Sequence, residues 1–262
     1  MEVPRGWIWP VQRFGGLPRF CGRAMAYELI RVADATALAV LVADQWLDRV
    51  EAAARAGAPH RVALAGGRIT ERFLRTVATR AVDRGVRLSD VDFFWGDERC
   101  VPPDDADSNH RLAREALFTP MGIDSSRIHR VLGELDAAAG AALAEQELRR
   151  VTGMHGAKMP QLDLVFLGMG EDAHVASLFP GATAAVTESV GVYVGVIGPK
   201  PPPRRVTLTY RALVAASEVW VLASGAGKEP ALRDSLESAS GTPLGRVLRE
   251  RSQTRIFTEL SV

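Results

Sequence analysis

Short apolar runs alternate with longer segments of helical periodicity along most of the chain. The apolar runs predict strands at residues 27–32, 61–65, 91–95, 162–167, 192–197, 218–223 and 255–257. The helical periodicity predicts helices at 35–57, 69–83, 109–118, 136–151 and 242–249, a short helix that ends before Pro180 and a helix that ends at Leu236. Asp34 and Ser108 stand where N-cap residues belong.

This alternation favours an α/β fold in one domain, with a mainly parallel, Rossmann-like central sheet flanked by helices. We expect the folded domain to span residues 25–262. Residues 1–24 are rich in Gly, Pro and Arg and are predicted to form a poorly ordered extension, so Met25 is a candidate natural start. No internal repeat or linker divides the rest of the chain.

Composition narrows the class of protein. Of 262 residues, 47% are hydrophobic, and 32 basic residues nearly balance 31 acidic ones, for a net charge of +1. The hydrophobic fraction excludes a disordered chain. The net charge near zero predicts no long-range attraction to nucleic acid or membranes. The only cysteines are Cys21 and Cys100, there is no apolar run of membrane-spanning length, and no signal-peptide pattern begins the chain. We therefore expect a cytoplasmic protein, monomeric or a small homo-oligomer.

Ligands of open parallel sheets bind in the loops at the carboxyl ends of the strands. Here that rule selects the loops after Ala65, Trp95, Leu167 and Ala223. All four contain glycine, and each carries a charged or titratable side chain within a few residues. Because the chain is nearly neutral, only a local cluster of charge can attract an anionic ligand. These loops are where we expect such a cluster.

The loop after Leu167 carries the strongest chemical signal. Gly168 and Gly170 let the backbone turn and approach a ligand, and Asp172 and His174 are predicted to open a short helix. His174 is the candidate general base, because imidazole titrates near neutral pH. The structural alternative is a simple strand-turn-helix junction.

Two further chemistries are weighed for this loop. Its G-x-G-x-x-A spacing resembles a dinucleotide fingerprint, but it lies too late in the chain and before too short a helix. Ser177 follows His174 by one helical turn, so a Ser–His nucleophile is conceivable, although no third member is indicated.

The loop after Trp95 is predicted to carry Asp97, Glu98 and Arg99. An arginine held between carboxylates can still offer donors to a substrate oxygen. The alternative is a solvated charge cluster.

Two other loops are candidates for binding phosphate. Gly66 and Gly67 precede a helix, so their backbone N–H groups and Arg68 can cradle an anion, whereas the alternative is a tight turn. Lys200 and Lys228, two of only three lysines, lie in Gly/Pro-rich loops. Lys228 suits a phosphate clamp, and surface charge is the favoured interpretation of Lys200. No histidine or cysteine spacing indicates a metal site, and no cofactor is expected.

Taken together, these motifs resemble the 6-phosphogluconolactonase family of the glucosamine-6-phosphate isomerase/6-phosphogluconolactonase superfamily. The resemblance rests on WGDER with Ser108-Asn109, LGMGEDAHVASLFPG, KPPPRRVTLT and GAGK, in the family's order, and runs from about Tyr27 to Phe257. It implies metal-free hydrolysis of 6-phospho-D-glucono-1,5-lactone, the second step of the oxidative pentose phosphate pathway.

The resemblance also implies a role for each candidate residue. His174, grouped with Asp172, would activate water against the lactone carbonyl, while Arg99 would stabilise the oxyanion with Asp97 and Glu98 orienting it. The further substrate-binding positions are Gly170 and, for the phosphate, Arg205, Lys228 and the amides of Gly66 and Gly67, with Arg68 nearby.

The chain departs from the family pattern at two places. Gly66-Gly67-Arg68-Ile69-Thr70 replaces Gly-Gly-Ser-Thr-Pro, so a guanidinium stands where hydroxyls are usual. Ala173 replaces the glycine before the histidine, and a positive φ there would strain it by roughly 1–2 kcal/mol. These departures leave two other functions open, namely a non-catalytic sugar-phosphate binding protein and an amino-sugar-phosphate deaminase.

Overall fold

The computed structural model describes residues 27–262. The predicted extension over 1–24 and the predicted start at Met25 lie outside the described residues. Six strands form one entirely parallel sheet in the order β1-β9-β8-β5-β2-β3. Their bounds are β1 Tyr27–Arg31, β2 His60–Leu64, β3 Val91–Trp95, β5 Leu164–Gly168, β8 Glu218–Ala223 and β9 Thr254–Thr258. The predicted parallel α/β architecture is confirmed.

A second, antiparallel sheet corrects the sequence-based prediction. It has the order β4-β7-β6, with β4 at Asp97–Arg99, β6 at Tyr193–Ile197 and β7 at Arg204–Leu208. The stretch after Trp95 was predicted to be a loop, and no strand was predicted after the prolines at 201–203. Both strands escaped detection because β4 is three charged residues long and β7 begins with two arginines. Tertiary pairing, rather than local pattern, makes them strands.

Most of the helices lie where the periodicity predicts them. Asp34 and Ser108 accept backbone N–H groups as N-caps of α1 and α3, as expected. A π-helical turn at Arg114–Phe118 continues α3, and α7 was not predicted. No helix within residues 27–262 is both long and apolar enough to cross a bilayer. The α-helices are α1 Ala35–Arg55, α2 Arg68–Arg84, α3 Asn109–Ala113, α4 Thr119–Met121, α5 Ala137–Thr152, α6 Ala184–Thr187, α7 Tyr210–Ala215, α8 Glu229–Ser235 and α9 Pro243–Glu250.

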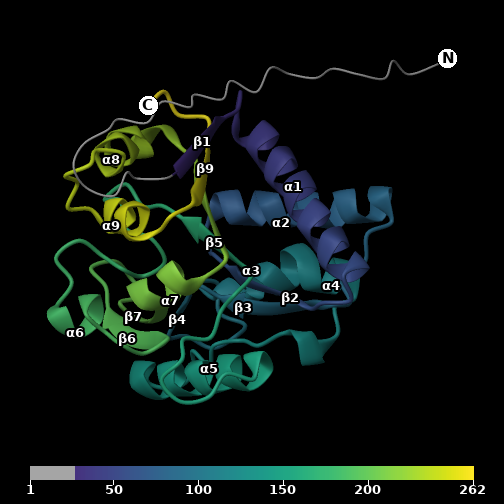
Figure 1. Ribbon diagram of the computed structural model, residues 1–262, viewed down its shortest axis with the longest axis horizontal. Helices are drawn as coiled ribbons and strands as arrows, with labels where there is room; N and C mark the ends of the chain where they lie inside the picture. Colours follow the sequence, from purple (N-terminus) through teal and green to yellow (C-terminus); the bar gives the residue numbers. More distant parts are fainter. Residues whose placement is uncertain (1–26) are drawn as a thin grey trace.

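An aromatic cluster joins α1 and α2 to the parallel sheet, while α5 packs against β6 and β7 (Figure 1). Trp46 of α1 and Phe73 of α2 both meet Phe166 of β5, with ring centroids 5.6 and 4.7 Å away. All three side chains are fully buried. This packing fixes β5, and with it the start of the loop that carries Asp172 and His174.

Candidate active site

The loops that follow β2, β3, β5 and β8 line one cleft of about 530 Å³, as the carboxyl-end rule predicts. Asp172 and Glu98, which sequence reasoning also placed in the site, do not line it. The other predicted site residues do, namely Gly66, Gly67, Arg68, Asp97, Arg99, Gly170, His174, Arg205 and Lys228.

His174 and Asp172 form a hydrogen-bonded dyad at the end of β5. His174 Nδ1 lies 2.5 Å from Asp172 Oδ1, so the ring donates from Nδ1 when the carboxylate is ionised. The other nitrogen, Nε2, then carries the lone pair of the neutral ring. Burial opposes ionisation of Asp172, but the hydrogen bond from His174 prevails and lowers the pKa of that carboxyl. An imidazole fixed in this tautomer is suited to accept a proton.

The loop around this dyad is not the helix that the sequence predicted. Residues 171–180 form turns and isolated bridges, because Ala173 and Ala176 adopt left-handed conformations with φ of 60° and 49°. A helix cannot pass through such residues. Instead, Gly170 N–H donates to His174 O and Ala173 N–H to Gly170 O, while Leu244 N–H of α9 holds Ala173 O at 3.2 Å. The loop that carries Asp172 and His174 is therefore a closed turn braced from α9, and the predicted helix N-terminus is absent.

Gly170 is required by the side chains that face it. A Cβ built on Gly170 would overlap the His174 ring and Asp172 Oδ1 at distances that no real Cβ atom shows. The dyad therefore packs against the bare backbone of Gly170. The sequence analysis assigned Gly170 to substrate binding; in the structure it also makes room for the dyad.

Arg99 presents a guanidinium without a carboxylate partner within residues 27–262. Its Nη1 donates to Asp107 O at 2.7 Å, and its Nε is buried with no hydrogen-bond partner among the described residues. Asp97 and Glu98 do not orient the Arg99 guanidinium as expected. From Arg99, Glu98 accepts the backbone N–H and no side-chain N–H. An unneutralised guanidinium at a cleft favours an anion or an oxyanion.

A second guanidinium, that of Arg205 on β7, lines the same cleft, and the Arg205 side chain is buried. It donates to Pro202 O and Lys200 O, and its Nη1 lies 4.0 Å from Asp97 Oδ2. Burial and then the charge of Arg99 lower its pKa. Two arginines that repel one another beside a cleft indicate that a negatively charged ligand completes the site.

Ser177 is a partner of Asp97 and not of His174. The Ser177 hydroxyl is fully buried and lies 2.6 Å from Asp97 Oδ2, and its N–H donates to Thr207 Oγ1 at 3.1 Å. Because the predicted helix is absent, Ser177 does not face His174 across a helical turn. The Ser–His nucleophile considered for this loop is not formed. Ser177 instead ties the 171–180 loop to β4 and β7.

Glu98, predicted to bind substrate, does not line the cleft. Its oxygens accept the N–H groups of Arg99, Asn109 and His110 and the Ser108 hydroxyl, at 2.7 to 3.2 Å. Burial raises its pKa to about 7 against those hydrogen bonds. The side chain therefore caps the start of α3 and has no oxygen turned to the cleft.

The Gly66–Gly67 turn and Arg68, which are predicted to bind phosphate, form the start of α2 and line the cleft together with Lys228. Gly67 has φ of +93° and caps α2 without any side-chain hydrogen bond, so the first N–H groups of this 17-residue helix are unoccupied by a cap. A Cβ on Gly66 would collide with the Asn109 carboxamide. Burial and then the positive charge of Arg68 lower the pKa of Lys228. Free amides and close cations are the donors that phosphate prefers.

Two contributors were missed by sequence reasoning. Lys200, interpreted as surface charge, places Nζ 3.5 Å from Asp172 Oδ2. Glu259 lines the cleft directly after β9. The carboxyl-end rule, applied to the last predicted strand as it was to four others, would have found Glu259; nothing local marks Lys200.

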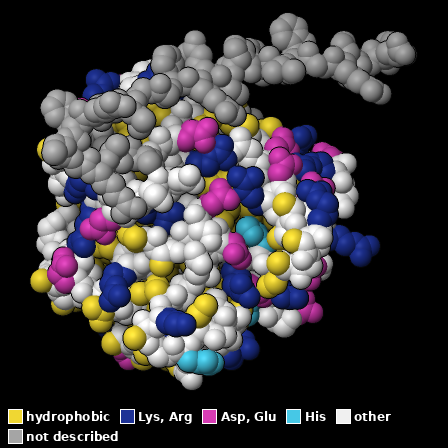
Figure 2. Space-filling view, in the orientation of Figure 1, with side chains coloured by type: hydrophobic (Ala, Val, Ile, Leu, Met, Phe, Trp, Pro, Cys, Tyr) yellow, Lys and Arg dark blue, Asp and Glu magenta, His cyan; other side chains and the backbone are white. Residues whose placement is uncertain are grey.

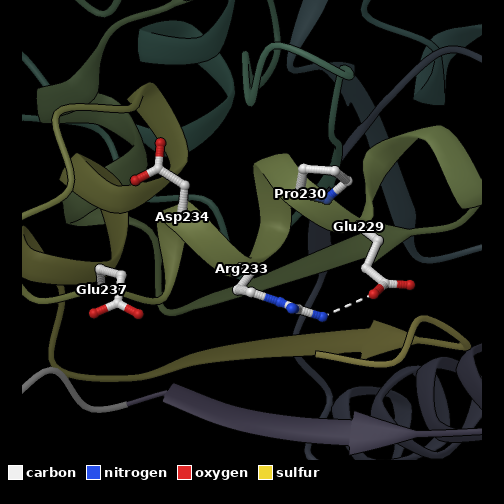
Figure 3. A pocket seen from close by; sticks show the side chains of 5 residues that line it. All are labelled: Glu229, Pro230, Arg233, Asp234 and Glu237. Atoms are coloured by element: carbon white, nitrogen blue, oxygen red, sulfur yellow. Dashed lines mark hydrogen bonds and ion pairs between the residues drawn. The ribbon is translucent and has the colours of Figure 1, made fainter.

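A second hollow, of about 380 Å³, lies over α8 (Figure 3). Arg233 is its only cation among residues 27–262, and Figure 3 shows it paired with Glu229, 2.8 Å away, while Asp234 and Glu237 add further negative charge. Such a surface repels a phosphorylated ligand, so the larger cleft is the candidate active site. Within residues 27–262, no three His, Cys, Asp or Glu side chains are arranged to hold a metal ion.

Comparison with known proteins identifies the family of the chain. The family described as glucosamine-6-phosphate isomerases/6-phosphogluconolactonase matches residues 33–256. The chain belongs to this family. Within it, the chain is 36% identical to the 6-phosphogluconolactonase of Mycobacterium tuberculosis over 214 residues, which cover 79% of this chain and 84% of that protein.

Solved structures of the family share the fold. The chain superposes on the devB protein with a TM-score of 0.79 and 29% identity, covering 88% of this chain and 96% of that one. It superposes on the 6-phosphogluconolactonase from Trypanosoma cruzi with a TM-score of 0.78 and 26% identity, covering 94% and 97%. The α/β fold with a mainly parallel sheet is thus the fold of this family.

Proposed function

We propose that the protein hydrolyses 6-phospho-D-glucono-1,5-lactone to 6-phosphogluconate, a step of the oxidative pentose phosphate pathway. The relatives named 6-phosphogluconolactonase support the reaction. The observation that carries it is the Asp172–His174 dyad, whose 2.5 Å bond leaves Nε2 as a base in the cleft that Arg99 and Arg205 also line.

The proposed chemistry uses water and the side chains of the cleft. His174 Nε2 accepts a proton from water as the water oxygen bonds to the lactone carbonyl carbon. Asp172 stabilises the resulting imidazolium, and Arg99 stabilises the oxyanion. When the bond from that carbon to the ring oxygen breaks, Nε2 returns the proton to the departing oxygen. One water is consumed, and the ring opens to the acid.

The phosphate is proposed to bind Lys228, Arg205 and the amides after Gly66, with Arg68 in place of the usual hydroxyls. Holding this remote dianion aligns the carbonyl with the water, so binding energy is used to lower the barrier. Loss of these contacts is expected to impair turnover as well as affinity.

We also infer a cytoplasmic protein that acts on a small sugar phosphate as a monomer or a small homo-oligomer. The nearly neutral net charge supports this inference. On the face drawn in Figure 2, basic and acidic side chains are interspersed, as expected for a protein that binds no nucleic acid.

One observation favours a second candidate, a sugar-phosphate binding protein without catalysis. Ala173 holds φ of 60° beside the proposed base, where the family has glycine. Such strain can displace His174 from its productive position.

A coupled assay separates these functions. Glucose-6-phosphate dehydrogenase generates the lactone, 6-phosphogluconate dehydrogenase detects the acid, and the spontaneous rate is subtracted. The lactonase predicts a rate well above background and no ammonia from glucosamine 6-phosphate. Binding of 6-phosphogluconate with only the background rate would favour the second candidate, and ammonia release would identify a deaminase.

A further inference from the structure

Glu259 occupies the cleft at the point where β8 and β9 end together. Ala223 and Thr258, the last residues of β8 and β9, pair in the parallel register. Ser224 and Glu259 are therefore the first residues after the two strands. Glu259 Oε1 accepts both the Ser224 hydroxyl and the Gly225 N–H, each at 2.8 Å. One carboxylate oxygen therefore anchors the first two residues of the loop that leads to Lys228.

The anchored loop needs such a fixed start. Gly225 has φ of +111°, a conformation that L side chains rarely adopt, and a 3-10 turn at Ala226–Lys228 follows directly. Lys228 is the last residue of that turn. The direction in which its side chain enters the cleft is consequently set within three residues of the Glu259 contact.

Charge couples Glu259 to Lys228 as well. No hydrogen bond or ion pair of the Lys228 ammonium occurs within the described residues, and burial is the main cause that lowers its pKa. Arg68 and Lys200 lower that pKa further, whereas Glu171 and Glu259 raise it. The second oxygen of Glu259, Oε2, is buried and has no hydrogen-bond partner among residues 27–262. Its negative charge is thus free to act on the cleft.

We propose that Glu259 is a positioning residue for phosphate recognition, which fixes the 224–228 loop through Ser224 and Gly225 and thereby places the Lys228 ammonium in the cleft. The inference rests on the proposed function only in taking Lys228 as a phosphate ligand. Glu259 itself does not touch the phosphate, because like charges repel.

The test is binding of inorganic phosphate, followed by calorimetry or phosphorus NMR from pH 8 to pH 10.5, where phosphate is a dianion. Glu259→Gln keeps the shape of the side chain but replaces two charge-assisted hydrogen bonds with weaker neutral ones. We therefore expect about tenfold weaker binding at pH 8, equivalent to roughly 1.4 kcal/mol. Affinity should also begin to fall at a lower pH than in the wild type, because Lys228 loses its proton more readily. A merely structural role would not move that pH limit.

The matched control is Glu229→Gln. Glu229 is adjacent to Lys228 in sequence, but it points to Arg233 over the second hollow (Figure 3). The control should bind phosphate as the wild type does. In a Lys228→Met background, Glu259→Gln should produce no further loss.

Three results would overturn the inference: wild-type affinity in Glu259→Gln, an equal loss in the Lys228→Met background, or a pH limit that does not move. The titration requires no turnover. A wild type that binds phosphate through Lys228 but hydrolyses no lactone therefore refutes the proposed function and leaves the role of Glu259 standing.

Discussion

Replacing Gly170 by alanine tests whether the dyad geometry is what the protein uses for catalysis. The added Cβ would overlap atoms of the His174 ring and Asp172 Oδ1. Both side chains must move away from it, which disturbs their 2.5 Å hydrogen bond. The variant therefore separates the two side chains while leaving both in the sequence.

The expected cost follows from what the dyad supplies. General-base catalysis contributes about 10²–10⁴-fold, and a displacement of 1 Å in a reactive group can cost on the order of 10²-fold. We expect kcat/KM of Gly170→Ala to fall by about 10²-fold or more. Phosphate affinity should hold, because the Gly66–Gly67 amides and Lys228 lie on other loops.

The structure offers a control two residues earlier, at the end of β5. A Cβ on Gly168 would meet only Gly66 O, at an ordinary 3.7 Å. Gly168→Ala should keep kcat/KM within a few-fold, and thermal unfolding should show both variants folded. The reasoning is refuted if Gly170→Ala retains its activity, or if Gly168→Ala loses as much as Gly170→Ala does.

Two further predictions concern strain and acid stability. Ala173→Gly relieves about 1–2 kcal/mol of left-handed strain, but it loses a buried methyl worth about 0.8 kcal/mol and adds unfolded-state entropy of about 0.4–1 kcal/mol. Its stability in urea should thus stay within about 1 kcal/mol of the wild type with activity retained, and a tenfold loss of activity would contradict this. Hydrogen bonds from Arg150 and His129 lower the pKa of Glu147 to about 2. The ionised carboxylate therefore stabilises the fold above about pH 4.5 and loses that effect as the pH falls towards 2. Urea unfolding of Glu147→Gln should show a deficit near neutrality that vanishes at low pH, and a deficit independent of pH would count against the assignment.

The periodicity of the chain was sufficient to predict the parallel sheet, because its buried strands are continuous apolar runs such as Leu164–Gly168. It could not predict β4 and β7, which are held by partners far away in sequence. The carboxyl-end rule selected four loops that line one cleft in the structure, so most residues of that lining could be named from the sequence.

The errors at the site have a common physical origin. Residues 171–180 have a helix-compatible composition, and only their φ angles, set by the packing of α9 and β7 around them, prevent a helix. Glu98 looks like a site residue in a charged motif, yet its orientation depends on N–H donors of α3. Side-chain direction of this kind is decided by tertiary contacts and not by local pattern.

The central claim is that His174 is the base of a lactone hydrolase, and the most direct test is the coupled lactone assay on His174→Ala. The account predicts a clear rate above background for the wild type, a loss of about 10²–10⁴-fold in the variant, and unchanged binding of 6-phosphogluconate. Retention of the wild-type rate by a folded His174→Ala protein would contradict it.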